Sequence, residues 1–209
     1  NDINSKTVVQ NLEETLALLA KIDKQKADIK DLEARIDGAA EQTTKAQKRL
    51  ETLKSTPAPS ATQFEKLSLA DLQAKLLSTQ QALQQIQSDA TGLNTELVTL
   101  RTAPERAQVT LNANLTRVQE INKLLANADT IPSGKVKLET ELALLELQNS
   151  FNKLLLQGNN VLTTLYTLEL EDKNLEVAQL QEQIKNLQDA INQKYLKESQ
   201  QQVEQLTKS

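Results

Sequence analysis

The sequence predicts an all-α fold: an elongated bundle of about five long helices with coiled-coil-like antiparallel packing. Apolar residues recur at three- and four-residue steps along nearly all of the 209 residues, as on one face of a helix, and strand-like alternation is missing. The four prolines nearly all fall between these periodic runs, and Gly158 marks one further break. Helices this long and polar cannot wrap around a compact core, so we expect them to pack side by side.

The composition favours narrow apolar seams over a thick core. Hydrophobic residues make up 38% of the chain, below the roughly 45–50% of ordinary globular proteins. There are two Phe and two Tyr, and Trp, Met, Cys and His are all missing. With 24 basic and 28 acidic residues the net charge is −4. The chain therefore lacks the basic surface expected of a nucleic-acid-binding protein and the polybasic run that binds anionic lipid.

Residues 1–55 are predicted to form one long N-terminal helix, followed by a proline-containing linker over residues 56–67. Pro57 and Pro59 cannot continue a helix, and each disfavours helical geometry in the residue before it. A short helical turn is expected to hold Phe64. The apolar stripe of the long helix is predicted to contain Leu12, Leu16, Leu19, Ile29 and Ile36.

Residues 68–209 are predicted to form a helical bundle with helices over about 68–101, 104–127, 134–157 and 159–206. Ser68 is a predicted N-cap, because its hydroxyl can accept a hydrogen bond from a free amide of the first turn. Pro104 is expected to break or kink the chain. Ser133 is expected to cap the next helix. Gly158 leaves two interpretations open, a turn or a local defect in one continuous helix, and its tolerance of left-handed geometry favours the turn.

Each of these helices has a predicted seam of apolar residues. The seam of the first contains Leu69, Leu72, Leu76, Leu83, Ile86, Leu93, Leu97 and Leu100. The second contains Val109 or Ala107, followed by Leu111, Leu115, Val118, Ile121 and Leu125. The third contains Leu138, Leu142, Leu145, Phe151 and Leu155. The fourth steps in alternating threes and fours, as a coiled coil does, through Val177, Leu180, Ile184, Leu187 and Ile191.

Two short patterns suggest chemistry, and each has a simpler interpretation. The run Pro132-Ser133-Gly134-Lys135 resembles the end of a phosphate-binding loop, but the earlier glycine and the preceding strand are missing, which favours a plain helix start. Glu169, Glu171 and Asp172 could hold Mg²⁺ or act as acid and base. Only Glu169 and Asp172 share a helix face, and Lys173 is adjacent, so a solvated charged surface is favoured.

Further candidate sites are equally weak. Phe151 and Tyr166 could stack on a ligand, but aromatics at helical spacing more often fill a seam. Asn114-Leu115-Thr116 matches the N-glycosylation triplet, which matters only in a eukaryotic secreted protein. Without His, Cys or a Gly-rich loop, a nucleophile would lack an ordinary base beside it. We therefore predict no catalytic, cofactor-binding or metal site, no cofactor and no enzymatic activity.

The sequence also bears on location. No stretch approaches the roughly 20 apolar residues of a membrane span. The chain begins at Asn1 without Met or a targeting segment, and we expect a mature or trimmed fragment. A cysteine-free chain is compatible with an oxidising compartment, and the Gln-, Asn- and Thr-rich surface suits a protein outside the cytosol.

Four stretches, in order and spacing, resemble a known family. They are LSLADLQ (67–73), LRTAPERAQ (100–108), LLQGNNVLTTLY (155–166) and LQDAINQKYLKESQQQVEQ (187–205). Together they are similar to the periplasmic N-terminal region, sometimes labelled the "porin" domain, of large mechanosensitive channels of the MscS superfamily, the MscK and MscM kind. The resemblance covers roughly residues 67–205. One departure is Tyr195, where that family tends to have Arg.

The resemblance implies a periplasmic, non-enzymatic structural or regulatory region of a bacterial mechanosensitive ion channel that protects against hypo-osmotic shock. The implied location is the periplasmic side of the inner membrane, in a multi-pass protein. Implied partners are the transmembrane and pore part of the same channel, further copies in a homoheptamer, and cell wall or other periplasmic components. Two alternatives stay open at this point: a coiled-coil adaptor of a secretion or efflux system, and a free-standing helical binding module.

Overall fold

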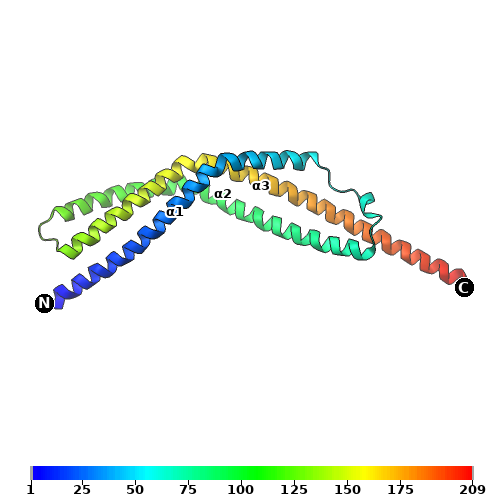
Figure 1. The fold of residues 1–209 in the computed structure, drawn as a ribbon, viewed down its shortest axis with the longest axis horizontal. Helices are drawn as coiled ribbons and strands as arrows, with labels where there is room; N and C mark the ends of the chain where they lie inside the picture. The colour runs from blue at the N-terminus through cyan, green and yellow to red at the C-terminus, as the bar shows by residue number, and fades with distance from the viewer. Residues whose placement is uncertain (1, 209) are drawn as a thin grey trace. The chain divides into compact units, whose positions relative to one another are not determined.

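Three long helices and one short 3-10 helix make up the fold. The structure, a computed structural model, describes residues 2–208. Helix α1 spans Asp2–Ser55, the 3-10 helix η1 spans Ala61–Phe64, α2 spans Leu69–Ala126 and α3 spans Pro132–Lys208 (Figure 1). Because residues 2–208 contain no strand, the all-α class is confirmed. The predicted count of about five long helices is wrong, because two expected breaks are helical. The division into domains 1–55, 56–67 and 68–209 stays a prediction.

The first missing break is at Pro104, which lies inside α2. A proline inside a helix removes the N–H that would bond the carbonyl four residues earlier, here that of Leu100. The side-chain amide of Asn159 on α3 donates to this carbonyl oxygen at 2.8 Å. The helix can continue through the proline because the carbonyl that the proline leaves without a backbone donor has a partner.

The second missing break is at Gly158, which lies inside α3. Neither the favoured turn nor a helix end is present, and no glycine of the described chain has a positive φ. A Cβ at this position would overlap the side chain of Ile36 on α1, with Cγ1 at 2.6 Å. The glycine thus allows a neighbouring helix to approach closely. It does not end the helix in a left-handed conformation.

One of the two predicted caps is confirmed. The Ser68 hydroxyl accepts a hydrogen bond from the Asp71 amide at 3.1 Å, at the start of α2. Ser133 does not cap α3, which begins at Pro132. Proline suits the first helical position because its missing N–H would have no partner there. The Ser133 hydroxyl instead accepts a hydrogen bond from the Asn11 side chain at 3.1 Å.

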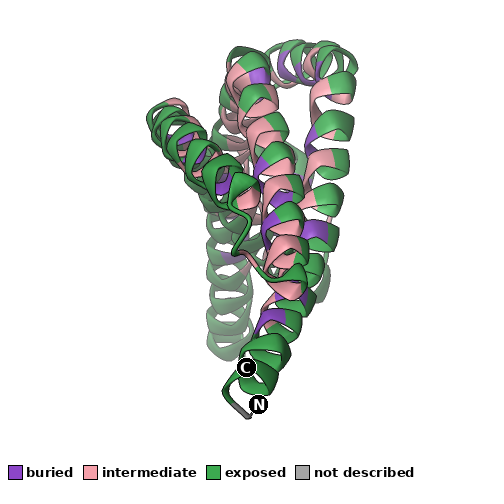
Figure 2. Cartoon of the chain, turned by 90° about the vertical axis from the view of Figure 1, so that its left-hand side faces the viewer, coloured by how far each residue is buried: buried purple, intermediate pink, exposed green. Residues whose placement is uncertain are grey.

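The helical segments cluster into two compact units, which we describe separately. The first unit comprises residues 1–41 and 98–164, and the second comprises residues 42–97 and 165–209. In both, the buried and half-buried residues form narrow stripes along the helices, and most of the remaining surface is exposed (Figure 2). The first unit has a core cluster of Ile121, Leu138 and Leu145. The second has a cluster of Phe64, Leu72, Leu187, Ala190 and Ile191.

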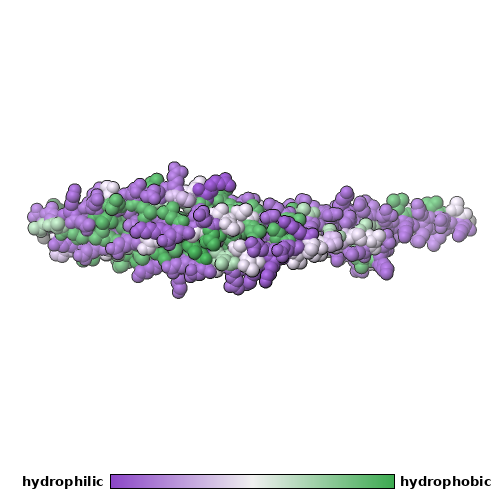
Figure 3. Space-filling model, turned by 90° about the horizontal axis from the view of Figure 1, so that it is seen from above, coloured by the Kyte–Doolittle hydropathy of each residue, from purple (hydrophilic) through white to green (hydrophobic). Residues whose placement is uncertain are grey.

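The buried stripe of α1 repeats every seven residues but differs from the predicted one. One series of buried and half-buried positions advances in alternating steps of four and three, the spacing of a coiled-coil seam: 11, 15, 18, 22, 25, 29, 32, 36, 39, 43, 46, 50 and 53. Positions 14, 28, 35 and 38 beside it are half-buried as well. Ile29 and Ile36 belong to the series, as predicted. Leu12, Leu16 and Leu19 do not and are exposed, because Asn11 and Thr15 face the interior in their place. Apolar side chains do reach the surface among hydrophilic ones (Figure 3).

The predicted seams of α2 and α3 are mostly confirmed. Every predicted seam residue from Leu69 to Leu100 is buried or half-buried, and so are those predicted for α3. Of the two choices offered, Ala107 is buried and Val109 is exposed. Leu115 is exposed because the polar Asn114 takes the interior position.

Within the described part of the chain, no helix has a segment apolar enough to cross a membrane.

Candidate functional site

A buried carboxylate is the most unusual chemical group of the second unit. Asp172 on α3 is only 2% exposed, and its two oxygens have no hydrogen-bond donor. Its ion-pair partner is Arg49 on α1, whose Nε lies 3.6 Å from Oδ2 while the guanidinium side chain is half exposed. Burial raises the pKa of Asp172, and the positive charge of Arg49 only partly opposes this shift.

The acidic cluster around Asp172 divides into two environments. Glu169 lies one turn earlier on the same face, and burial raises its pKa as well. Glu171 points away and pairs with Lys54 at 3.8 Å on the surface. The predicted solvated surface is therefore wrong for Asp172 and correct for Glu171. Among the residues that the structure describes, no group of three or more acidic residues is arranged to hold a metal ion.

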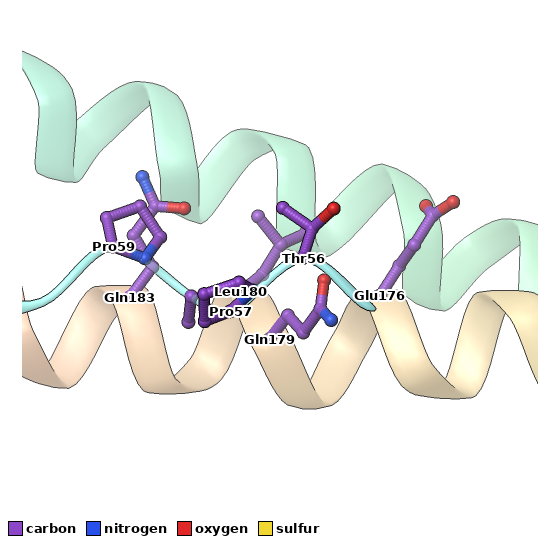
Figure 4. Close-up of a pocket in the computed structure, with 8 residues that line it drawn as sticks. Thr56, Pro57, Pro59, Glu176, Gln179, Leu180 and Gln183 are labelled. Atoms are coloured by element: carbon purple, nitrogen blue, oxygen red, sulfur yellow. The ribbon is translucent and has the colours of Figure 1, made fainter. Parts of the chain in front are cut away.

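A small groove lies between the proline linker and α3 in the second unit. Its volume is about 210 Å³, and Figure 4 shows Pro57 and Pro59 of the linker next to Gln179, Leu180 and Gln183 of α3. Two side chains of α3 bond the backbone on either side of this groove, one in the last turn of α1 and one in the linker. Gln179 donates to the carbonyl of Leu53 at 2.7 Å, and Asn186 donates to the carbonyl of Pro59 at 3.0 Å. The groove follows from the docking of an extended segment that cannot form helical hydrogen bonds.

A second groove of about 470 Å³ lies near the η1 helix. It is lined by Ala61, Glu65, Asp189, Ala190, Asn192, Gln193, Lys194, Leu196 and Lys197. The first groove has Glu176 as its one charged lining residue, and the second is lined by charged side chains of both signs.

Polar pairs join the helices of the first unit. The Arg117 guanidinium of α2 makes two 2.8 Å hydrogen bonds to the Glu141 carboxylate of α3, and these bonds raise the pKa of Arg117. Lys137 of α3 bonds the Glu14 carboxylate of α1 at 2.9 Å, and this contact lowers the pKa of Glu14. Two-point charged hydrogen bonds such as the Arg117 pair are directional, so they favour one register of the helices.

Asn114 is the polar centre of this unit. It is buried and donates to Gln148 at 3.3 Å and to Asn149 at 3.0 Å on α3. A glycan on this side chain would displace those contacts, so the triplet Asn114-Leu115-Thr116 does not fit a glycosylation site. The run 132–135, whose resemblance to a phosphate-binding loop was set against a plain helix start, is the first turn of α3. Phe151 and Tyr166 are half-buried on α3, and 15 helical residues separate them by about 22 Å.

A close crossing of all three helices in the first unit was not predicted. Ile36 of α1 occupies the space beside Gly158 of α3, Asn159 reaches the freed carbonyl of α2, and Ala103 and Ala107 of α2 are almost fully buried. One signal could have found it. The steps of three and four that define the apolar seam of α2 continue through position 104. A helix that ended there would have interrupted this spacing. Nothing in the sequence indicates that Asn159 in particular supplies the missing donor.

Comparisons with known proteins agree with the resemblance of the sequence. The family model described as "Mechanosensitive ion channel porin domain" matches residues 1–209. An "Uncharacterized MscS family protein" of Haemophilus influenzae is 30% identical over 199 residues, which cover 95% of this chain and 18% of that protein. The "Mechanosensitive channel MscK" of Escherichia coli K12 is 31% identical over 198 residues, covering 91% and 18%.

The chain therefore spans less than a fifth of the length of these relatives. No solved structure matches it. The comparisons do not favour the secretion or efflux adaptor. A family model that covers the whole chain, together with two relatives at 30% identity or more, is sufficient to assign the family. The chain belongs to the porin-domain family of MscS-type mechanosensitive ion channels.

Proposed function

We propose that this chain is a periplasmic, non-enzymatic structural and regulatory region of a bacterial mechanosensitive ion channel that protects the cell against hypo-osmotic shock. The observation that carries the proposal is the family match over residues 1–209. The name of the Escherichia coli relative supports it. Because the chain covers 18% of that relative, every property of the complete channel belongs to the proposal.

The geometry supports a mechanical role more than a chemical one. The long helices pack along seams with a seven-residue repeat, an arrangement typical of extended helical proteins. Directional polar pairs such as Arg117–Glu141 fix the register of neighbouring helices. The chain has no His and no Cys, so it lacks the imidazole that most often acts as a general base and the thiol nucleophile.

The proposed partners are those of a channel subunit. They are the transmembrane and pore part of the same protein, further copies of it in a homoheptamer, and cell wall or other periplasmic components. We propose no cofactor and no nucleic acid, because the net charge is −4 and basic and acidic residues are interspersed.

Patch-clamp recording tests the regulatory role. The full-length channel and a version that lacks residues 1–209 are compared in excised membrane patches at matched expression. We expect the deletion to change the tension threshold or the rate of inactivation, and to reduce survival of hypo-osmotic shock. An unchanged threshold, unchanged inactivation and unchanged survival would refute a role in gating.

The periplasmic location has a separate test, which uses the fact that these 209 residues contain no cysteine. In a full channel whose other cysteines are replaced by serine, a single cysteine at the exposed Ser199 should react in intact cells with a maleimide that cannot cross the inner membrane. A cysteine at the buried Ala46 is the matched control and should stay unlabelled until the protein is denatured. Labelling of Ser199→Cys only after the cells are opened would place the region on the other side of the membrane.

A further inference from the structure

Three neighbouring carbonyls of α2, just before Pro104, accept hydrogen bonds from side chains. The hydroxyl of Thr102 lies 3.4 Å from the carbonyl oxygen of Val98. The Arg106 guanidinium donates to the carbonyl of Thr99 at 3.2 Å. The Asn159 amide donates to the carbonyl of Leu100 at 2.8 Å. Asn159 differs from the others because it belongs to a different helix.

The Leu100 carbonyl has no backbone donor within α2 and therefore depends on the Asn159 amide. In an uninterrupted helix the N–H of residue 104 would bond it, and proline has none. Leu100 is only 3% exposed, and a buried carbonyl without a partner costs as much as a lost hydrogen bond. The bond from Asn159 therefore replaces a backbone bond of α2 with a bond between α2 and α3.

The surroundings fix the position of Asn159. Its neighbour Gly158 is in contact with Ile36 of α1, with no room for a Cβ. Ala103 of α2 is 2% exposed in the same region. Close approach of the three helices brings a short side chain within reach of the α2 backbone, and a larger separation would break the bond.

We propose that residues 100–104 of α2 form a conditional bending point, which the Asn159 amide holds in the helical state. Two states follow. In the bridged state Asn159 bonds the Leu100 carbonyl and α2 continues through Pro104. In the released state α3 has moved away, water bonds the carbonyl, and α2 bends at the proline, where sharp helix kinks usually occur. The inference concerns this chain alone and does not depend on its role in a channel.

Amide hydrogen exchange of the 209-residue chain tests the proposal. Asn159→Asp keeps the size of the side chain but removes the donor. We expect exchange of the amides over residues 101–108 to become about tenfold faster, as expected for one lost hydrogen bond to a buried group. Asn160→Asp is the matched control, because this adjacent side chain is exposed, and should leave those amides unchanged.

A double-mutant cycle separates the bridge from general packing. Pro104→Ala restores a backbone donor for the Leu100 carbonyl, so Asn159→Asp in that background should change exchange less than about twofold. If Asn159→Asp prevents folding, adding Pro104→Ala should restore it. The proposal fails if Asn159→Asp leaves exchange over 101–108 unchanged, or if its effect is the same with and without Pro104.

Discussion

At the scale of single residues, glycines of this chain differ in what surrounds them. A Cβ at Gly158 would overlap Ile36, whereas a Cβ at Gly92 would meet nothing within 4 Å. Alanine is favoured over glycine in helices by about 1 kcal/mol. The two substitutions to alanine should therefore have opposite signs, because only one of them must displace a neighbour.

We predict that Gly158→Ala lowers the free energy of unfolding by about 1–3 kcal/mol, the usual cost of overpacking. Gly92→Ala is the control and should raise it by up to about 1 kcal/mol. Urea unfolding followed by circular dichroism measures both. Ile36→Ala removes the atoms that clash, so the double variant Ile36→Ala, Gly158→Ala should lose less than the sum of the single losses. Strict additivity would show that Ile36 is not the obstacle.

The buried Asp172 makes a second residue-scale prediction, about pH. Burial raises the pKa of this carboxyl in the folded protein, so the folded state favours the protonated form. The stabilising contribution is fully present below the unfolded pKa of about 3.9 and is lost as pH rises through the folded pKa. At neutral pH the ionised Asp172 therefore destabilises the fold relative to a neutral side chain.

We predict that Asp172→Asn raises the free energy of unfolding at pH 7.5, because the new side chain is neutral and the half-exposed Arg49 left behind stays hydrated. The gain should shrink as the pH falls toward 4, because Asp172 itself becomes neutral. Arg49→Gln is the companion variant. It removes the counter-ion and should lower stability at pH 7.5 by about 1–3 kcal/mol. A gain from Asp172→Asn that did not change between pH 4 and 7.5 would contradict this account.

At the scale of elements, burial follows seven-residue spacing more faithfully than it follows hydrophobicity. The sequence is sufficient to predict the seams of α2 and α3, because leucine and isoleucine occupy most of their positions. On α1 the sequence predicts that Leu12 and Leu16 are buried, but the buried residues there are Asn11 and Thr15. These polar side chains can be buried because Asn11 bonds Ser133 on α3, and Thr15 bonds the Asn11 carbonyl of its own helix.

Helix ends, like buried stripes, can be predicted from the sequence only in part. Pro57 and Pro59 lie outside helices as local sequence predicts, because two prolines so close together remove two helical N–H groups within one turn. Pro104 is a single proline and lies inside α2, where a residue 55 positions later in the chain bonds the freed carbonyl. The buried ion pair of Asp172 likewise depends on Arg49, 123 positions earlier. Such partnerships depend on tertiary contacts that local patterns do not contain.

The linker makes an element-scale prediction. We expect Gln179→Ala combined with Asn186→Ala to release the extended segment 56–60, because these side chains bond the carbonyls of Leu53 and Pro59. Limited proteolysis over residues 56–63 should become about tenfold faster, for two lost hydrogen bonds of about 1 kcal/mol each, partly replaced by water. Gln183→Ala is the control, because Gln183 lines the same groove and bonds neither of these two carbonyls, and it should leave the rate unchanged. Equal rates in all three proteins would rule out a role for these bonds in docking the linker.

At the scale of the whole molecule, each of the long helices contributes to both compact units. The unit boundaries fall at 41/42 in α1, at 97/98 in α2 and at 164/165 in α3, inside helices that run without interruption. Unfolding of one unit would therefore create three new helix ends at the border of the other. Each new end leaves backbone groups without intrahelical partners, and helices without tertiary packing are marginally stable. The two units should for this reason unfold together.

We predict one cooperative thermal transition, and the same one in variants of either core. Ile121→Ala in the first unit and Leu187→Ala in the second remove fully buried side chains, which costs about 2–5 kcal/mol each. Both should lower the midpoint of the same transition by about 5–15 °C, with hydrogen exchange accelerated in the core amides of both units. Exposed Leu206→Ala is the matched control and should change little. Two separate transitions, of which Ile121→Ala shifted one and Leu187→Ala the other, would show that helix continuity does not couple the units.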